Sequence, residues 1–103
     1  MTVVVVATVH PLPEYRDEIV ALFEKTIARV HAEDAGCELY AMHQDAQTLL
    51  MIEKWSNADA LQAHSTGPAL TELNPALEGK LASRTQVRIY TPHPAGTAEL
   101  GAL

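Results

Sequence analysis

The sequence predicts an α+β protein with a ferredoxin-like fold, in which the elements follow the order β-α-β-β-α-β and the sheet is antiparallel. Two observations support this prediction. Four segments are rich in β-branched residues or alternate between apolar and polar ones, as strands do. Two longer regions between them repeat apolar residues every three or four positions, as helices do. The order of these segments places both helical regions on one face of the sheet.

The first part of the chain supplies a strand and a long helix. Residues 2–10, TVVVVATVH, are mostly β-branched and apolar and predict a buried strand. Pro13 suits the first turn of a helix, and acidic residues follow it near the positive end of the helix dipole. The helix is expected to run to about Ala32 and to end before Gly36. Its apolar stripe consists of Tyr15, Ile19, Leu22, Phe23, Ile27 and Val30.

The middle of the chain predicts a β-hairpin and a short helix. Residues 37–44 and 48–55 read as two strands that flank the polar turn QDAQ. Ser56 and Asp59 have the spacing of a capping box. A short helix is therefore expected to begin there and to run to about His64.

The last part of the chain predicts one more helix and one more strand. Gly67-Pro68 should begin the helix, and Asn74-Pro75 should kink or restart it. Residues 84–91, RTQVRIYT, form the last predicted strand. Residues 1–92 then make one domain, and the Gly-, Pro- and Ala-rich segment 93–103 is expected to be a flexible tail. The apolar stripe of the last helix consists of Leu70, Leu73, Leu77 and Leu81.

The predicted strands carry apolar residues on both faces, although helices on one side of a sheet can cover only one of them. In the first strand, Val3 and Val5 point one way while Val4 and Val6 point the other. The hairpin strands show the same pattern. We therefore expect a homodimer in which two copies pack sheet against sheet through one self-complementary interface. The alternative is a single chain with a partly apolar sheet face in water.

Charge and composition exclude several classes of partner. The net charge is −6, and the seven Lys and Arg residues form no basic run, which argues against binding to nucleic acid or to an anionic membrane surface. The longest apolar run, residues 3–9, is too short to span a bilayer. The single cysteine, Cys37, cannot form an internal disulfide. These features favour a soluble protein of the cytoplasm.

The residue types that bind metals or phosphates show no suitable spacing. The five histidines and the one cysteine lack metal-ligand patterns. The five glycines form neither a phosphate loop nor a dinucleotide-binding motif, and no nucleophile elbow is present. We therefore expect no metal and no bound cofactor.

Three segments, in matching order and spacing, resemble the antibiotic biosynthesis monooxygenase (ABM) family, and within it the small bacterial quinol monooxygenases. They are AEDAGCELY at 32–40, MIEKWSNADALQAH at 51–64 and VRIYTP at 87–92. The most specific part is a glutamate two residues before a tryptophan, followed nine residues later by a histidine. The resemblance implies a dimeric α+β barrel. It also implies oxygenation of a small phenolic or quinol substrate by molecular oxygen, without metal, flavin or haem.

The resemblance leaves other functions open, because a fold does not fix a reaction. Family members include isomerases, so an isomerase or tautomerase of a small hydroxy-carbonyl metabolite is one alternative, and a non-catalytic small-molecule binding protein is another. Haem-degrading relatives carry a tryptophan and a histidine where this chain has His64 and Asn74. Antibiotic-tailoring relatives carry an asparagine and a tyrosine where it has Met51 and Leu61.

The chemistry that the resemblance implies requires a base. Triplet oxygen reacts poorly with closed-shell organic molecules, but a deprotonated hydroquinone can give it an electron. A base with a pKa near neutrality is then needed, and histidine is the natural candidate. His64 shares a helical face with Leu61 and should point inward, as this base, as an orienting donor, or as a structural histidine. Trp55 is a wall of the substrate pocket by resemblance, or otherwise a core aromatic residue.

A second group of residues would support this pocket. Glu53 should be buried in the middle of a strand, which is costly unless the carboxylate is paired. Arg88 or His64 is the expected partner, and an ion pair between Glu53 and Arg88 would support the site.

Three further polar residues are candidates for substrate binding. Tyr40 could donate a hydrogen bond to a substrate oxygen or could simply pack with its hydroxyl in water. His43, near the end of a strand, could reach the mouth of the pocket or could be solvated. Asn74 is either a helix cap before Pro75 or a polar group of the pocket.

Overall fold

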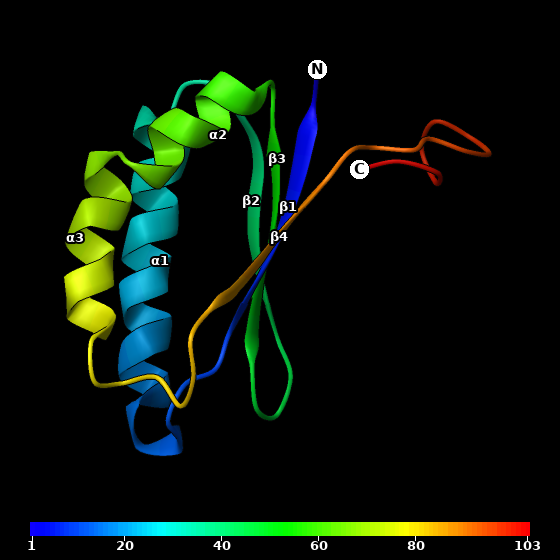
Figure 1. Ribbon diagram of the computed structural model, residues 1–103. Coiled ribbons are helices and arrows are strands. Elements are labelled where there is room, and N and C mark those ends of the chain that lie inside the picture. The colour runs from blue at the N-terminus through cyan, green and yellow to red at the C-terminus, as the bar shows by residue number, and fades with distance from the viewer.

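The computed structural model describes all residues, 1–103, and has two layers, a four-stranded antiparallel sheet and a layer of helices on one of its faces (Figure 1). The strand order across the sheet is β2-β3-β1-β4, so the two strands at its centre are not neighbours along the chain. The predicted ferredoxin-like fold is thereby confirmed. The elements in chain order are β1 (Val3–Val9), the 3₁₀ turn η1 (Pro13–Tyr15), α1 (Arg16–Glu33), β2 (Cys37–Gln44), β3 (Leu49–Trp55), α2 (Ala58–Ser65), α3 (Pro68–Leu77) and β4 (Gln86–Tyr90).

The long helix α1 forms where the sequence predicts it and buries one stripe against the sheet. Ile19, Phe23 and Val30 are buried on this stripe, and Thr26 joins them because its hydroxyl donates to the carbonyl oxygen of Leu22 at 3.0 Å. The stripe is shorter than predicted at its start, since Tyr15 lies in η1 and is 37% exposed.

The turn between α1 and β2 requires a glycine. Gly36 has a φ of +82°, a conformation that residues with a side chain rarely adopt. A Cβ at this position would also lie 2.6 Å from the Cβ of Ala60 and 2.7 Å from the Oγ of Ser56. The chain therefore passes here in close contact with the start of α2.

The structure corrects three details of the second helical region. Asn57 rather than Ser56 caps α2, because its side-chain oxygen accepts a hydrogen bond from the backbone N–H of Ala60 at 2.8 Å. Pro75 lies inside the last turn of α3 and does not split the helix, since one missing N–H removes only one bond near a helix end. Leu81 lies beyond α3, where it bridges to Pro11 instead of extending the helical stripe.

The face of the sheet that points toward the helices carries the core. Val5, Val9, Leu49, Met51 and Trp55 are each at most 1% exposed there. On β4 the same face is left open, because Val87 and Ile89, whose partners in the register are inward-facing residues of β1, are 60% and 63% exposed. The helices thus cover β1, β2 and β3 but leave the edge strand β4 uncovered.

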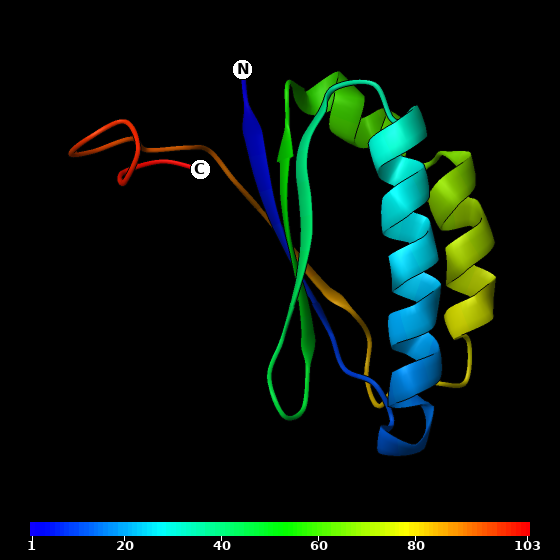
Figure 2. The same cartoon turned by 180° about the vertical axis from the view of Figure 1, so that it is seen from behind.

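We call the opposite face of the sheet the outer face. Strand register and alternation place on it Val4, Val6, Thr8, Leu39, Ala41, His43, Leu50, Ile52, Lys54, Gln86, Arg88 and Tyr90. No helix lies over it, and the segment that follows β4 leaves the sheet on this side, as both views show (Figures 1 and 2). Lys54 contacts this segment through the backbone oxygen of Leu103 at 2.8 Å. None of the helices is of a length and apolarity that would let it cross a membrane.

Candidate active site

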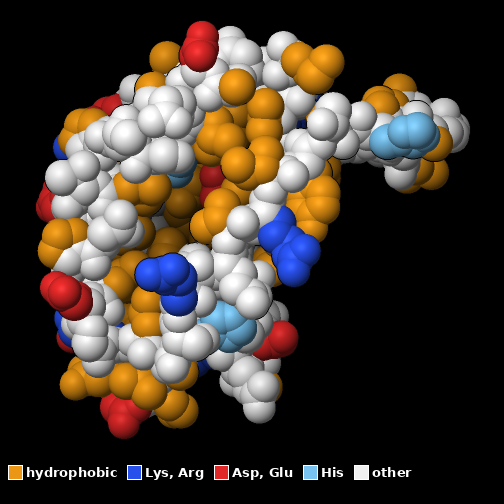
Figure 3. Space-filling model, in the orientation of Figure 1, with side chains coloured by type: hydrophobic (Ala, Val, Ile, Leu, Met, Phe, Trp, Pro, Cys, Tyr) orange, Lys and Arg blue, Asp and Glu red, His pale blue; other side chains and the backbone are white.

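A cavity of about 290 Å³ lies between the helices and the sheet, with its opening beside β4. In Figure 3 it appears as a hollow walled by hydrophobic side chains, with an acidic and a histidine side chain visible in its upper part. The opening exists because the helices stop short of β4. The side chains that bring polar groups to the lining are Tyr40, Glu53, His64, Ser65, Asn74 and Thr85. No Lys or Arg lines the cavity.

His64 is held in the cavity wall by a carboxylate from the loop that follows α1. Its Nδ1 lies 2.7 Å from Oδ2 of Asp34, and the two side chains are only 3% and 15% exposed. A carboxylate can only accept, so the imidazole donates through Nδ1–H and the neutral ring has its lone pair on Nε2. Nε2 has no partner in the protein and is not sealed from the cavity, since no fully buried side-chain nitrogen or oxygen lacks a hydrogen bond. His64 is thereby oriented to accept a proton from a bound molecule.

Glu53 brings a carboxyl group to the same cavity from the middle of β3. Its side chain is 4% exposed, and its hydrogen bond comes from Nε1–H of Trp55 to Oε1 at 2.9 Å. Burial raises the pKa of Glu53, and the indole hydrogen bond and the nearby His64 oppose this rise only in part. The site therefore holds a carboxyl group that takes up a proton more readily than one in water.

Trp55 does not line the cavity, which corrects its expected role as a pocket wall. The indole is 0% exposed and lies behind the two polar groups, donating to Glu53 and packing against His64 with ring centroids 4.4 Å apart. Trp55 is the last residue of β3, and His64 of α2 packs on its ring, so the indole is fully covered and does not reach the cavity. Trp55 therefore positions Glu53 and His64 without lining the cavity itself.

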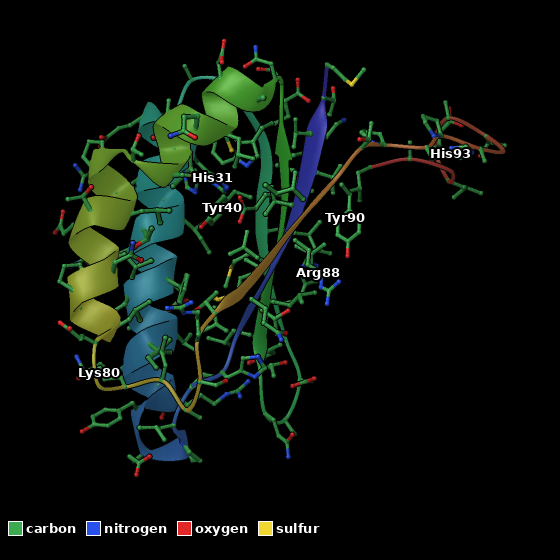
Figure 4. The ribbon with its side chains drawn as sticks, viewed as in Figure 1. His31, Tyr40, Lys80, Arg88, Tyr90 and His93 are labelled. Atoms are coloured by element: carbon green, nitrogen blue, oxygen red, sulfur yellow. The ribbon has the colours of Figure 1, made fainter.

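Tyr40 of β2 brings a phenol group to the cavity. It lies on the helix side of the sheet (Figure 4), with its ring centroid 5.2 Å from that of His64. Burial, together with the charge of Glu53, raises the pKa of the Tyr40 phenol well above its usual range. The hydroxyl therefore stays protonated and can donate a hydrogen bond to a ligand oxygen. The strand is held here by His31, whose Nε2–H donates to the Tyr40 carbonyl oxygen at 3.0 Å.

Two of the expected site residues lie elsewhere. Arg88 pairs in register with Val6 and points to the outer face, as Figure 4 shows, so the expected ion pair with Glu53 is wrong. Its neighbours Val87 and Ile89 take the inward positions of β4, and Arg88 alternates with them. His43 pairs with Leu50, is exposed on the outer face and does not line the cavity.

The structure decides between the two roles expected of Asn74 and adds Asp34 to the site. Asn74 is not a helix cap, because α3 continues to Leu77; it lies on the rim of the cavity. Asp34 was not predicted as a site residue, although a buried histidine needs a polar partner and Asp34 directly follows a helix end. No group of three or more His, Cys, Asp or Glu side chains is placed to hold a metal ion.

The environment of Glu53 predicts a pH-dependent stability. Glu53→Gln should keep the oxygen that accepts from Trp55 and should raise the melting temperature at neutral pH. A carboxyl group whose pKa is raised by folding stabilises the folded state at pH values below its ordinary pKa of 4.5. This stabilisation is lost as the pH increases through the pKa of the folded state. The gain of the variant should therefore vanish near about pH 4 and grow toward about pH 8. Calorimetry of both proteins across this range tests it, and a pH-independent difference in melting temperature would contradict it.

Comparison with known proteins agrees with this architecture. Residues 2–75 match the sequence profile of a protein family described as antibiotic biosynthesis monooxygenase. Comparison with curated proteins gives no match.

Solved structures share the fold at low sequence identity. Rv0793 from Mycobacterium tuberculosis superposes with a TM-score of 0.85 at 22% identity, over 94% of this chain and 100% of that one. A conserved protein from Methanosarcina mazei Go1 superposes with a TM-score of 0.80 at 27% identity, over 87% of this chain and 91% of that one. PA3566 from Pseudomonas aeruginosa superposes with a TM-score of 0.78 at 22% identity, over 86% of this chain and 91% of that one.

Proposed function

The chain belongs to the antibiotic biosynthesis monooxygenase family, and on this basis we propose that it oxidises a small phenolic or quinol substrate with molecular oxygen and without a bound cofactor. The observation that carries the proposal is the pair formed by His64 and Asp34, which presents an oriented imidazole to an otherwise mostly apolar cavity. Such a cavity suits an aromatic ring, and the volume of about 290 Å³ is at the lower end of the range for ligand pockets.

The residues suggest how the first step would proceed. Nε2 of His64 would take the proton of a substrate hydroxyl, while Asp34 stabilises the imidazolium that forms. The Tyr40 hydroxyl would donate a hydrogen bond to the oxygen that becomes negative. The apolar walls would keep water from the anion, so that it remains a strong electron donor.

The remaining steps would need the bound anion, oxygen and the proton that His64 took in the first step. The phenolate would transfer one electron to O₂, and the resulting radical pair would combine at a ring carbon that carries hydrogen to form a peroxide anion. The peroxide anion would take back the proton held by His64 and become a hydroperoxide. Loss of water from the hydroperoxide leaves a quinone. One atom of O₂ thus enters the product and the other leaves as water, and the protein itself is neither oxidised nor reduced.

Oxygen consumption with isotopic labelling tests this proposal. We expect the purified protein, with a hydroquinone or naphthol, to consume one O₂ per substrate and to place one labelled oxygen atom in the product. The protein should show no flavin or haem absorbance, and a chelator should not change the rate. Uptake that catalase halves, with no label in the product, would mean peroxide-forming oxidation and would contradict the proposal. Activity removed by a chelator and restored by a metal would contradict its cofactor independence.

The presence of two proton-transfer groups at one cavity supports an isomerase as the second candidate. His64 and Glu53 could take a proton from one atom of a hydroxy-carbonyl compound and return it to another, without oxygen. Incorporation of deuterium next to the carbonyl under anaerobic conditions would identify this activity. Binding of the same compounds with neither oxygen uptake nor exchange would instead indicate a binding protein.

We further propose that two copies pack through the outer face as a homodimer. Valines and isoleucine on that face are only partly covered in one chain. Sedimentation at micromolar concentration should give about twice the chain mass of 11.2 kDa. Ile52→Lys should yield the monomer, because it buries a charge in the interface, while the matched Gln62→Lys on the exposed side of α2 should leave the dimer intact. A folded wild-type monomer would rule out the dimer and the barrel.

A further inference from the structure

The lining of the cavity contains one acidic side chain, Glu53, and no Lys or Arg, and this affects which ligands the cavity can bind. Glu53 is 4% exposed, with a neutral indole as its hydrogen-bond donor. His64 is the one lining residue that can become positive, and Asp34 already lies 2.7 Å from its ring. Even when protonated, His64 would therefore have its charge largely balanced by Asp34.

The basic residues of the chain are placed elsewhere. Of the seven, Arg16, Arg29, Lys54 and Lys80 bond to groups outside the cavity, and Arg88 lies on the outer face. The remaining two, Lys25 and Arg84, are exposed, and neither lines the cavity. A negative group placed beside Glu53 would thus meet a like charge and find no cation to balance it.

We propose that the cavity selects uncharged ring compounds and rejects those that carry a carboxylate next to the hydroxyl group, and that Glu53 is the residue responsible. The inference uses the same cavity as the proposed function but concerns binding alone. Burial at this place disfavours a negative charge, which raises the pKa of Glu53. The same burial would disfavour a carboxylate on the ligand. The accepted class is then a neutral phenol or hydroquinone, whose hydroxyls donate to Glu53 or His64 and whose ring contacts the apolar walls.

A matched pair of ligands isolates the charge. 2,5-Dihydroxybenzamide and 2,5-dihydroxybenzoate have the same ring and nearly the same size, and only the second is an anion at neutral pH. Anaerobic calorimetry or equilibrium dialysis should show the wild-type protein binding the amide at least about 10-fold more tightly. In Glu53→Gln this ratio should fall to about 3-fold or less, because the isosteric amide side chain removes the charge. Glu24→Gln, on the exposed side of α1, removes the same charge from a residue that does not line the cavity and should keep the wild-type ratio.

A second variant tests the same idea by adding a cation. Asn74 is exposed on the cavity rim, so Asn74→Lys should fold and should improve binding of the benzoate relative to the amide. Equal affinities of the wild-type protein for the two ligands, a ratio unchanged in both Glu53→Gln and Asn74→Lys, or no binding of the amide at millimolar concentration would each overturn the inference. Selective binding of the amide without any oxygen uptake would preserve it while removing the proposed monooxygenase activity.

Discussion

Replacing His64 with glutamine should lower the turnover of a hydroquinone by about 100-fold or more while the protein remains folded. Glutamine is similar in size and can still donate to Asp34, so the link between α2 and the loop after α1 should survive. It cannot accept a proton near neutral pH, so the step that makes the substrate an electron donor would be lost. Turnover per folded protein, measured beside circular dichroism and melting temperature, tests this prediction.

Two further variants make the result interpretable. Asp34→Asn should leave the imidazole in place but remove the charge that stabilises its protonated form, so we expect a smaller fall in kcat and a change in the pH profile. His93→Gln, in the exposed segment after β4, makes the same substitution far from the cavity and should behave as wild type. Normal turnover in His64→Gln would remove this histidine from the mechanism.

Replacing Trp55 with phenylalanine should reduce the free energy of unfolding by about 2 kcal/mol or more at neutral pH. The change removes the indole N–H that donates to Glu53 and leaves a buried carboxyl group without its partner. It also removes ring volume from a side chain that is 0% exposed. Urea denaturation of the two proteins measures the difference.

A double-mutant cycle separates the hydrogen bond from the packing. In the background of Glu53→Leu, which has no carboxyl group to satisfy, Trp55→Phe should cost clearly less than in the wild-type protein. An equal loss of stability in both backgrounds would show that Trp55 acts through packing alone. Because Trp55 lies behind the cavity, ligand affinity should fall less than stability does.

The fold could be predicted because its signals are local. The β-branched run of β1, the spacing of Ile19, Phe23 and Val30, and the polar turn between β2 and β3 each specify their own element. The order of the elements then leaves few possible topologies. The capping residue of α2 was misplaced by one position because Ser56 and Asn57 are both good caps, and only the backbone geometry decides between them.

The candidate site could be predicted only where a side chain's direction follows from its own element. The alternation of β3 places Glu53 inward, and the helical spacing of α2 does the same for His64. Asp34 lies thirty residues before His64, and nothing local indicates that the two meet. Arg88 was assigned to the wrong face because its charge complements Glu53, whereas its alternation with Val87 and Ile89 carries the correct signal.

The close approach of the chain at Gly36 to the start of α2 limits which substitutions this turn can tolerate. A side chain there would strain the backbone and push the start of α2 away, and Asp34, two residues earlier, would move with the turn. Mutational tolerance should therefore be low at this corner and high on the rim, where Asn74 is exposed. Combinatorial libraries that seek new substrates should keep residues 34–36 fixed and place their diversity around the opening of the cavity.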